Sequence, residues 1–193
     1  LHGPVIAHDG ENPLRQDYGQ VILSTKLAEI LPSINPDLPQ DAIYQVIKDV
    51  ERIQSPDLLK NNEDFHRFIT DGIPVTYRAN GVEKHDYCWL IDFEHPERNS
   101  FIAVNQFTIL ENNNNKRPDI ILFINGLPLV VIELKNAADE NATIRKAFDQ
   151  IQTYKATIPT LFNYNAVCVV SDGHECKAGT ISAGFSRYMA WKT

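Results

Sequence analysis

The dipeptide Asn125-Gly126 is the feature that most constrains how this chain can fold. It lies between two dense apolar runs, residues 120–124 and residues 129–132. Asn and Gly both tolerate a positive backbone φ, so this dipeptide between apolar runs is the strongest short-range signal for a β-hairpin. Two adjacent antiparallel strands are therefore predicted, and the residues at their open end must lie close together.

Charged residues flank this predicted hairpin at its open end. Asp119 precedes the first strand, and Glu133 and Lys135 follow the second strand with Leu134 between them. Alternate residues of a strand point to the same face, so Glu133 and Lys135 share one face. Leu134 is expected to pack into the core on the opposite face of the strand. A charge that ends an apolar strand is costly unless it faces solvent or a ligand.

The register of the hairpin decides whether Asp119 joins that face. A two-residue loop at Asn125-Gly126 pairs Asp119 with Ile132 and puts the aspartate on the wrong face. A loop of odd length, or a single bulge, pairs Asp119 with Glu133 and aligns all three charged side chains. We predict the odd register, because Gly126 tolerates the left-handed conformation and Pro128 cannot donate to the ladder.

The rest of the sequence predicts an α/β (α+β-like) fold with a central mixed β-sheet flanked by helices. Apolar spacing and start signals predict helices over 14–31, 41–54, from Ser55-Pro56, over 63–69 and over 139–154. Strands are predicted at 73–78, 87–93, 101–110 and 166–170, and the asparagine run 112–115 predicts a solvated hairpin loop. We expect a single domain over 1–193, with a mainly helical part at 1–72 and a sheet-containing catalytic core at 73–193. We also expect it to be a fragment of a longer polypeptide.

Composition excludes several functional classes. The sequence has no apolar run long enough for a bilayer span, so no membrane role is expected. Its three cysteines, Cys88, Cys168 and Cys176, form no CxxC pair, which favours a reducing cytoplasm over a disulfide framework. The six histidines form no zinc motif. The net charge of −7 argues against a protein whose main task is to grip nucleic acid, but not against a nuclease.

The flanking charges have the chemistry of a phosphodiester hydrolase. Two converging carboxylates, Asp119 and Glu133, offer oxygen ligands of the kind that Mg²⁺ prefers, and the Lys135 ammonium can position water or neutralise developing charge. Gln150 and Tyr154 lie four residues apart, on one face of the predicted helix, and could line the same site. The alternative for Glu133 and Lys135 is an exposed ion pair at a strand end. A second Glu-x-Lys, at 175–177, is interpreted as surface charge.

These motifs together resemble those of a known nuclease family. Arg117-Pro118-Asp119, Glu133-Leu134-Lys135 and Gln150-x-x-x-Tyr154 resemble the PD-(D/E)xK signature with its RecB-type QxxxY extension. The resemblance is closest to the N-terminal nuclease domain of the R (restriction, motor) subunit of type I restriction-modification enzymes. Further matching segments are residues 104–107, 125–129, 132–136 and 152–155.

The resemblance implies a type I site-specific deoxyribonuclease, a Mg²⁺-dependent endonuclease that cleaves double-stranded DNA away from its recognition sequence. In that family Asp119 and Glu133 would be the metal ligands, Lys135 the catalytic lysine, and Gln150 and Tyr154 accessory residues. Cleavage would follow ATP-driven translocation by helicase-like motor domains C-terminal to this region. The implied partners are a specificity (S) subunit and a methyltransferase (M) subunit that uses S-adenosylmethionine. This sequence has no GxxxxGK[ST] motif and so is not itself the motor.

Two alternatives and one ligand stay open. The same motifs occur in the nuclease part of RecB-like repair helicases, and a nuclease-like fold could also serve mainly as a docking module for other subunits. Many such nucleases carry an additional acidic residue on their first helix. Asp17, Gln20 and Glu29 are the local candidates, and none of them is assigned.

Overall fold

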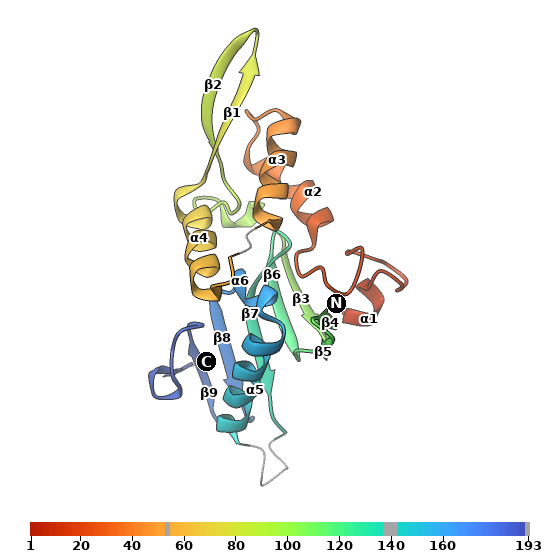
Figure 1. Ribbon diagram of the computed structural model, residues 1–193, viewed down its shortest axis with the longest axis vertical. Coiled ribbons are helices and arrows are strands. Elements are labelled where there is room, and N and C mark those ends of the chain that lie inside the picture. The colour runs from red at the N-terminus through yellow and green to blue at the C-terminus, as the bar shows by residue number, and fades with distance from the viewer. Residues whose placement is uncertain (53–54, 137–142, 192–193) are drawn as a thin grey trace.

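The computed structural model describes residues 1–52, 55–136 and 143–191 (Figure 1). Four helices come first: α1 (Gly3–Ile6), α2 (Ser24–Ile34), α3 (Gln40–Glu51) and α4 (Leu58–Asp71). Seven strands follow: β1 (Ile73–Ala79), β2 (Val82–Cys88), β3 (Phe101–Asn105), β4 (Ile109–Glu111), β5 (Asn114–Lys116), β6 (Ile120–Ile124) and β7 (Leu127–Leu134). The described chain ends with α5 (Ile144–Thr157), α6 (Pro159–Asn163), β8 (Val167–Ser171), β9 (Cys176–Gly179) and β10 (Met189–Ala190).

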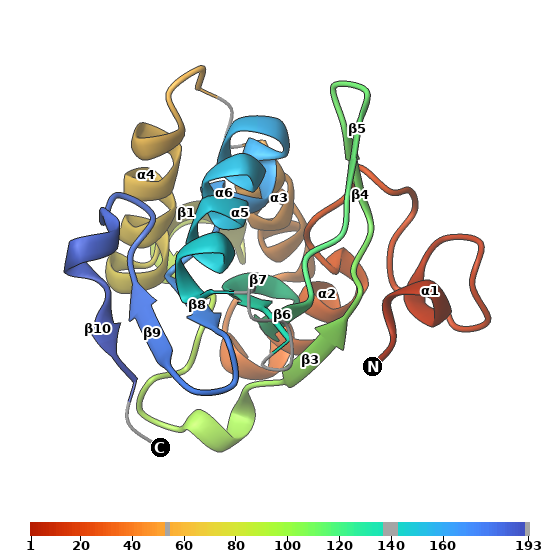
Figure 2. The same ribbon diagram turned by 90° about the horizontal axis from the view of Figure 1, so that it is seen from below.

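A mixed six-stranded sheet in the order β10-β9-β8-β7-β6-β3 forms the centre of the fold. Only β7 and β8 run parallel in it, and the other described pairs are antiparallel. A parallel pair needs a crossover connection, which α5 and α6 supply. Figure 2 shows both helices on one face of the sheet. The predicted α/β architecture with a mixed sheet and flanking helices is confirmed.

The β6–β7 hairpin has the predicted odd register. Its turn is the two-residue loop Asn125-Gly126, with φ values of 54° and 86°. Next to the turn, Ile124 pairs with Leu127. A bulge after the following pair shifts the alignment by one residue, so that Ile120 pairs with Ile132. The same alignment extended by one residue sets Asp119 opposite Glu133. The single bulge, rather than a longer loop, therefore produces the register that the charged residues require.

Alternation along β7 decides which face of the sheet is the core. Leu129, Val131 and Glu133 are buried on the face that α5 covers, whereas Leu134 on the opposite face is 43% exposed. The expectation that Leu134 packs into the core is therefore wrong. The reason is that α5 packs against the face to which Glu133 belongs, so that the glutamate, and not the leucine, points inward.

The N-terminal helices differ from their predicted bounds. Residues 14–23, predicted as the start of a helix, form a loop, because the Asp17 carboxylate accepts the N–H groups of Gly19 and Gln20 and stabilises a turn. α2 begins only at Ser24 and continues through Pro32. The two short helical segments predicted around 55–69 are one helix, α4, whose N-cap is Asp57.

The strands outside the central sheet also correct the prediction. β1 and β2 form a hairpin through Asn80-Gly81, another turn with both φ values positive, and this hairpin projects from the body of the molecule (Figure 1). The second strand ends at Cys88, so residues 89–93 are not the predicted strand. The predicted strand 101–110 is divided at Gln106 into β3 and β4.

The asparagine run and the helix of the QxxxY motif are partly as expected. Asn112 and Asn113 form the turn between β4 and β5 with positive φ, as predicted, while residues 114 and 115 already belong to β5. α5 carries Gln150 and Tyr154 as predicted and extends beyond 154 to Thr157. The predicted helix start at 139 lies outside the described residues.

Candidate active site

Asp119 lies directly before β6, at the open end of the hairpin. Its side chain is fixed by two donors from different segments. The backbone N–H of Leu134 donates to Oδ2 at 2.8 Å, and the Gln106 amide Nε2 donates to Oδ1 at 3.3 Å. The first of these contacts joins the aspartate to the end of β7. It is thus the direct consequence of the bulged register that pairs the two strands.

Glu133 is the most deeply placed charged group of the site, with only 4% of the residue exposed. Its Oε1 accepts a hydrogen bond from Lys135 Nζ at 2.9 Å, and its Oε2 accepts one from the Tyr154 hydroxyl at 3.2 Å. Burial raises the pKa of Glu133, the Lys135 hydrogen bond opposes that rise, and the nearby charge of Asp119 adds to it. The two carboxylates are therefore close enough to repel each other.

The motif on α5 meets the strands at Glu133. Tyr154 is buried, and burial first and then the charge of Glu133 raise the pKa of its phenol above the usual value. The phenol therefore stays protonated and donates its hydrogen bond. Gln150, half-buried, lies one turn earlier on the helix, and its side chain opposes the rise in the Tyr154 pKa. The structure thus brings all five predicted site residues to the open end of the hairpin.

An open depression of about 360 Å³ lies over this cluster. Asp119 and Lys135 form part of its wall, with Asn105 and Gln106 from the end of β3 beside them. Glu133 is buried and is not among the lining residues, although its carboxylate contacts Lys135, which is one of them. Asn105 and Gln106 are not among the predicted site residues, and the only sequence signal for them is that segment 104–107 resembles the nuclease family.

The donor set suits a hard divalent cation with few protein ligands. The described residues contain no cluster of three histidine, cysteine, aspartate or glutamate side chains that could hold a metal ion. Mg²⁺ commonly uses only one or two carboxylates and completes its coordination with water and substrate phosphate. Asp119 and Glu133 supply two carboxylates, and a carboxylate oxygen that accepts one hydrogen bond still has a second lone pair for a metal ion.

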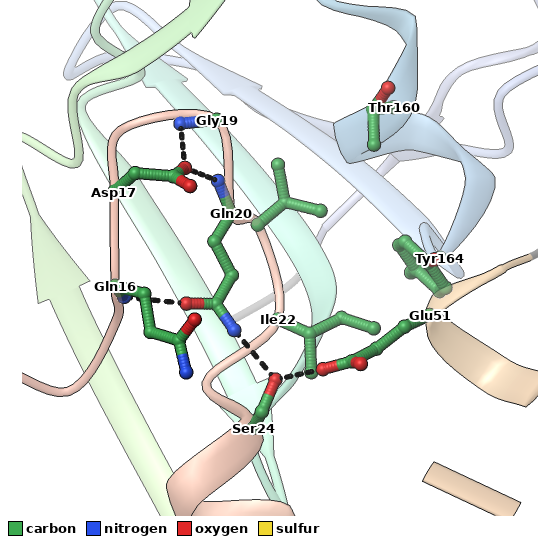
Figure 3. Close-up of a pocket in the computed structure, with 10 residues that line it drawn as sticks. Gln16, Asp17, Gly19, Gln20, Ile22, Ser24, Glu51, Thr160 and Tyr164 are labelled. Atoms are coloured by element: carbon green, nitrogen blue, oxygen red, sulfur yellow. Dashed lines mark hydrogen bonds between the residues drawn. The ribbon is translucent and has the colours of Figure 1, made fainter. Parts of the chain in front are cut away.

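The candidates for an additional acidic ligand lie elsewhere. Asp17 caps its own turn, Gln20 donates to Ser24, and Glu29 forms an ion pair with Lys26. Figure 3 shows the first two of these in a different cavity, of about 510 Å³, which also contains Glu51. That cavity shares no lining residue with the depression at Asp119. The additional ligand therefore stays unassigned.

The second Glu-x-Lys forms a local ion pair, and its lysine also lies over the Phe185 ring. Glu175 and Lys177 are 3.0 Å apart at the start of β9, and the glutamate side chain is well exposed. This strand pairs with β8 in the central sheet. However, the Glu175 side chain is exposed, whereas that of Glu133 is buried, and no tyrosine in the described ranges donates a hydrogen bond to Glu175.

Comparison with known protein families agrees with this geometry. The family described as the type I restriction enzyme R protein N terminus matches residues 3–187, nearly the whole chain. The chain belongs to this family. Membership favours the restriction enzymes over the RecB-like repair helicases that the motifs alone also allowed.

Three relatives of this chain come from three different organisms. It is 42% identical over 186 residues to the type I restriction enzyme HindI endonuclease subunit of Haemophilus influenzae, covering 96% of the chain and 18% of the relative. It is 33% identical over 181 residues to the putative type I restriction enzyme MjaIXP endonuclease subunit of Methanocaldococcus jannaschii, covering 92% of the chain and 17% of the relative. It is 31% identical over 112 residues to the type I restriction enzyme SauCOLORF180P endonuclease subunit of Staphylococcus aureus strain COL, covering 58% of the chain and 11% of the relative.

The chain thus spans less than a fifth of the length of these relatives. None of the helices in its described ranges is long and apolar enough to cross a membrane.

Proposed function

We propose that this chain is the Mg²⁺-dependent endonuclease domain of a longer type I restriction subunit and hydrolyses phosphodiester bonds of double-stranded DNA. The family and the endonuclease names of the relatives support a role in restriction. The observation that carries the chemistry is the convergence of two carboxylates, one ammonium and one phenol at the end of a single hairpin. An exposed strand-end ion pair would not need a buried glutamate or a tyrosine from another element.

Asp119 and Glu133 would hold the Mg²⁺ ion. When bound, the metal would lower the pKa of a water molecule and stabilise negative charge on the scissile phosphate. The Tyr154 hydroxyl holds one oxygen of Glu133, which leaves the carboxylate in a fixed orientation. Gln150, one helical turn earlier, lowers the pKa of that phenol and so partly offsets the effect of burial.

Lys135 is the chain's own cation at the site. Its ammonium lies 2.9 Å from Glu133 and also forms part of the wall of the depression, where a DNA phosphate would approach. In that position it can donate a hydrogen bond to the attacking water or to a phosphate oxygen. The buried part of the site would thus orient the ligands while the exposed part meets the substrate.

The wider assembly is part of the proposal. The relatives' names place them in type I restriction enzymes, and the chain corresponds to less than a fifth of their length. We infer that the remaining length carries ATP-dependent motor domains. We also infer that methyltransferase and specificity subunits complete the complex, the former using S-adenosylmethionine, and that the complex works in the reducing cytoplasm.

Cleavage of circular plasmid DNA by the assembled complex, with Mg²⁺ and ATP, tests the site. Glu133→Gln and Lys135→Ala should each reduce cleavage by at least about a hundredfold, by analogy with the loss of one transition-state donor. ATP hydrolysis, which the motor would perform, should be unchanged. Glu175→Gln and Lys177→Ala alter the second Glu-x-Lys of the same chain and should cleave like the parent.

The test also separates the enzyme from a docking module. A docking module predicts that all four variants assemble and cleave like the parent, because the nuclease would be elsewhere. Cleavage that survives both Glu133→Gln and Lys135→Ala in an assembled complex would overturn the proposed function.

A further inference from the structure

Gln106 has a backbone conformation that is unusual for its residue type. Its φ is 55°, in the left-handed region. The other four non-glycine residues with positive φ in the described chain are all asparagines, whose short side chain tolerates this region. Gln lacks that advantage, so its surroundings must hold it in place. Strained residues of this kind cluster at functional sites.

Gln106 contacts Asp119 twice. Its backbone N–H donates to the backbone carbonyl of Asp119 at 2.9 Å, and its side-chain amide donates to Oδ1 at 3.3 Å. The other oxygen, Oδ2, is held by the N–H of Leu134. The left-handed turn at the end of β3 thus lets one residue fix both the main chain and the carboxylate of the aspartate.

The N-terminal segment braces this turn from the other side. A Cβ atom added at Gly3 would overlap the carbonyl oxygen of Gln106 and approach Phe107 Cα within 2.9 Å. Asn105, the residue before the turn, donates its N–H to the Leu1 carbonyl at 3.1 Å and pairs with the His2 ring at 3.0 Å. Close packing against α1 therefore holds the backbone of Gln106 in its left-handed conformation.

We propose that Gln106 is a positioning residue that orients the Asp119 carboxylate for a divalent cation. This inference rests on the proposed function. An amide is suited to the task because it donates a hydrogen bond without bringing a positive charge, so Asp119 keeps its full charge for the metal. Gln106 and Asp119 line the same depression, so the contact lies where the cation would bind. Outer-shell partners of this kind commonly change metal affinity by about 10–100-fold when removed.

Calorimetric titration of the protein with Mn²⁺, as a probe for Mg²⁺, tests the inference directly. Gln106→Ala should weaken Mn²⁺ binding by about tenfold or more. In the assembled complex, the same variant should need a correspondingly higher Mg²⁺ concentration for half-maximal cleavage, with most of the maximal rate restored at saturation. Gln45→Ala on α3, which removes an exposed glutamine bonded to Asp49, should bind and cleave like the parent.

A second variant separates the amide contact from the backbone turn. Gln106→Asn keeps a side chain that tolerates positive φ but is one methylene too short for the same contact. It should fold like the parent, by circular dichroism, and still weaken Mn²⁺ binding. If both variants bind Mn²⁺ as tightly as the parent, the inference is overturned.

Ligand variants distinguish this failure from failure of the proposed function. Asp119→Asn and Glu133→Gln should abolish Mn²⁺ binding if these residues hold the metal. If the ligand variants lose Mn²⁺ binding and Gln106→Ala does not, only the positioning role of Gln106 is rejected. Full binding in the ligand variants would reject the metal site itself.

Discussion

Asn125 offers the sharpest test of how the hairpin holds the site together. The residue is completely buried, and its backbone has the left-handed conformation of the turn. Its side chain also makes three hydrogen bonds. The amide nitrogen donates to Leu90 O and to Asn99 Oδ1, both at 2.8 Å, and Oδ1 accepts from Ser100 N at 2.7 Å. The turn residue therefore also joins the hairpin to the loop that precedes β3.

Replacing Asn125 by Gly keeps the backbone conformation and deletes this network. Each net hydrogen bond contributes about 1 kcal/mol, and buried partners left unsatisfied cost about 1–3 kcal/mol each. Three lost bonds should therefore lower the free energy of unfolding by about 3 kcal/mol or more. Urea unfolding followed by circular dichroism measures this loss.

Asn80→Gly is the matched control. Asn80 occupies the equivalent position of the β1–β2 turn with the same φ of 54°, but its side chain is exposed. The cost in backbone entropy is common to both substitutions, so their difference isolates the buried network. We expect the control to change stability by less than about 0.5 kcal/mol. Equal losses in the two variants would refute the view that Asn125 does more than form a turn.

Three further predictions concern local chemistry. Removal of the Asp57 cap by Asp57→Ala should lower the free energy of unfolding by about 1 kcal/mol in the same assay; no loss would contradict its capping role. Burial raises the pKa of Cys88 to about 12 and of Cys168 to about 11. Because the thiolate is the reactive form, a thiol reagent at pH 8 should label only Cys176 in the native protein, and rapid labelling of all three would show that the core opens. Tyr154→Phe should retain the fold but reduce plasmid cleavage about tenfold or more through the loss of its hydrogen bond to Glu133, and parental cleavage would exclude that role.

The sequence predicted the parts of the structure that local rules determine. Asn125-Gly126 between apolar runs predicts the hairpin, and the need to align Asp119 with Glu133 predicts its odd register, which the bulge provides. The helix that carries Gln150 and Tyr154 follows from apolar periodicity. These features could be predicted because strand alternation and helical spacing depend only on residues that are close in the sequence.

Features that depend on tertiary packing could not be predicted in this way. Leu134 was assigned to the core because leucine is apolar, yet the core side of β7 is decided by where α5 packs. The break at Gln106 is invisible in a run of strand-forming residues, since its cause is the packing of Gly3 from a distant segment. Residues 14–23 have helical spacing, but the Asp17 turn competes locally with the helix.

The charges of the site give an independent argument for a cation. Two carboxylates and one ammonium have a formal charge of −1 when all three groups are ionised. Burial and the charge of Asp119 both work against ionisation of Glu133, while the Lys135 hydrogen bond favours it. A single ammonium, itself partly exposed, cannot neutralise two carboxylates at different depths. A divalent cation between them would reverse the net charge to +1, the sign that attracts a DNA phosphate into the depression. Such a cation would also stabilise the ionised form of Glu133, which burial disfavours in the free protein.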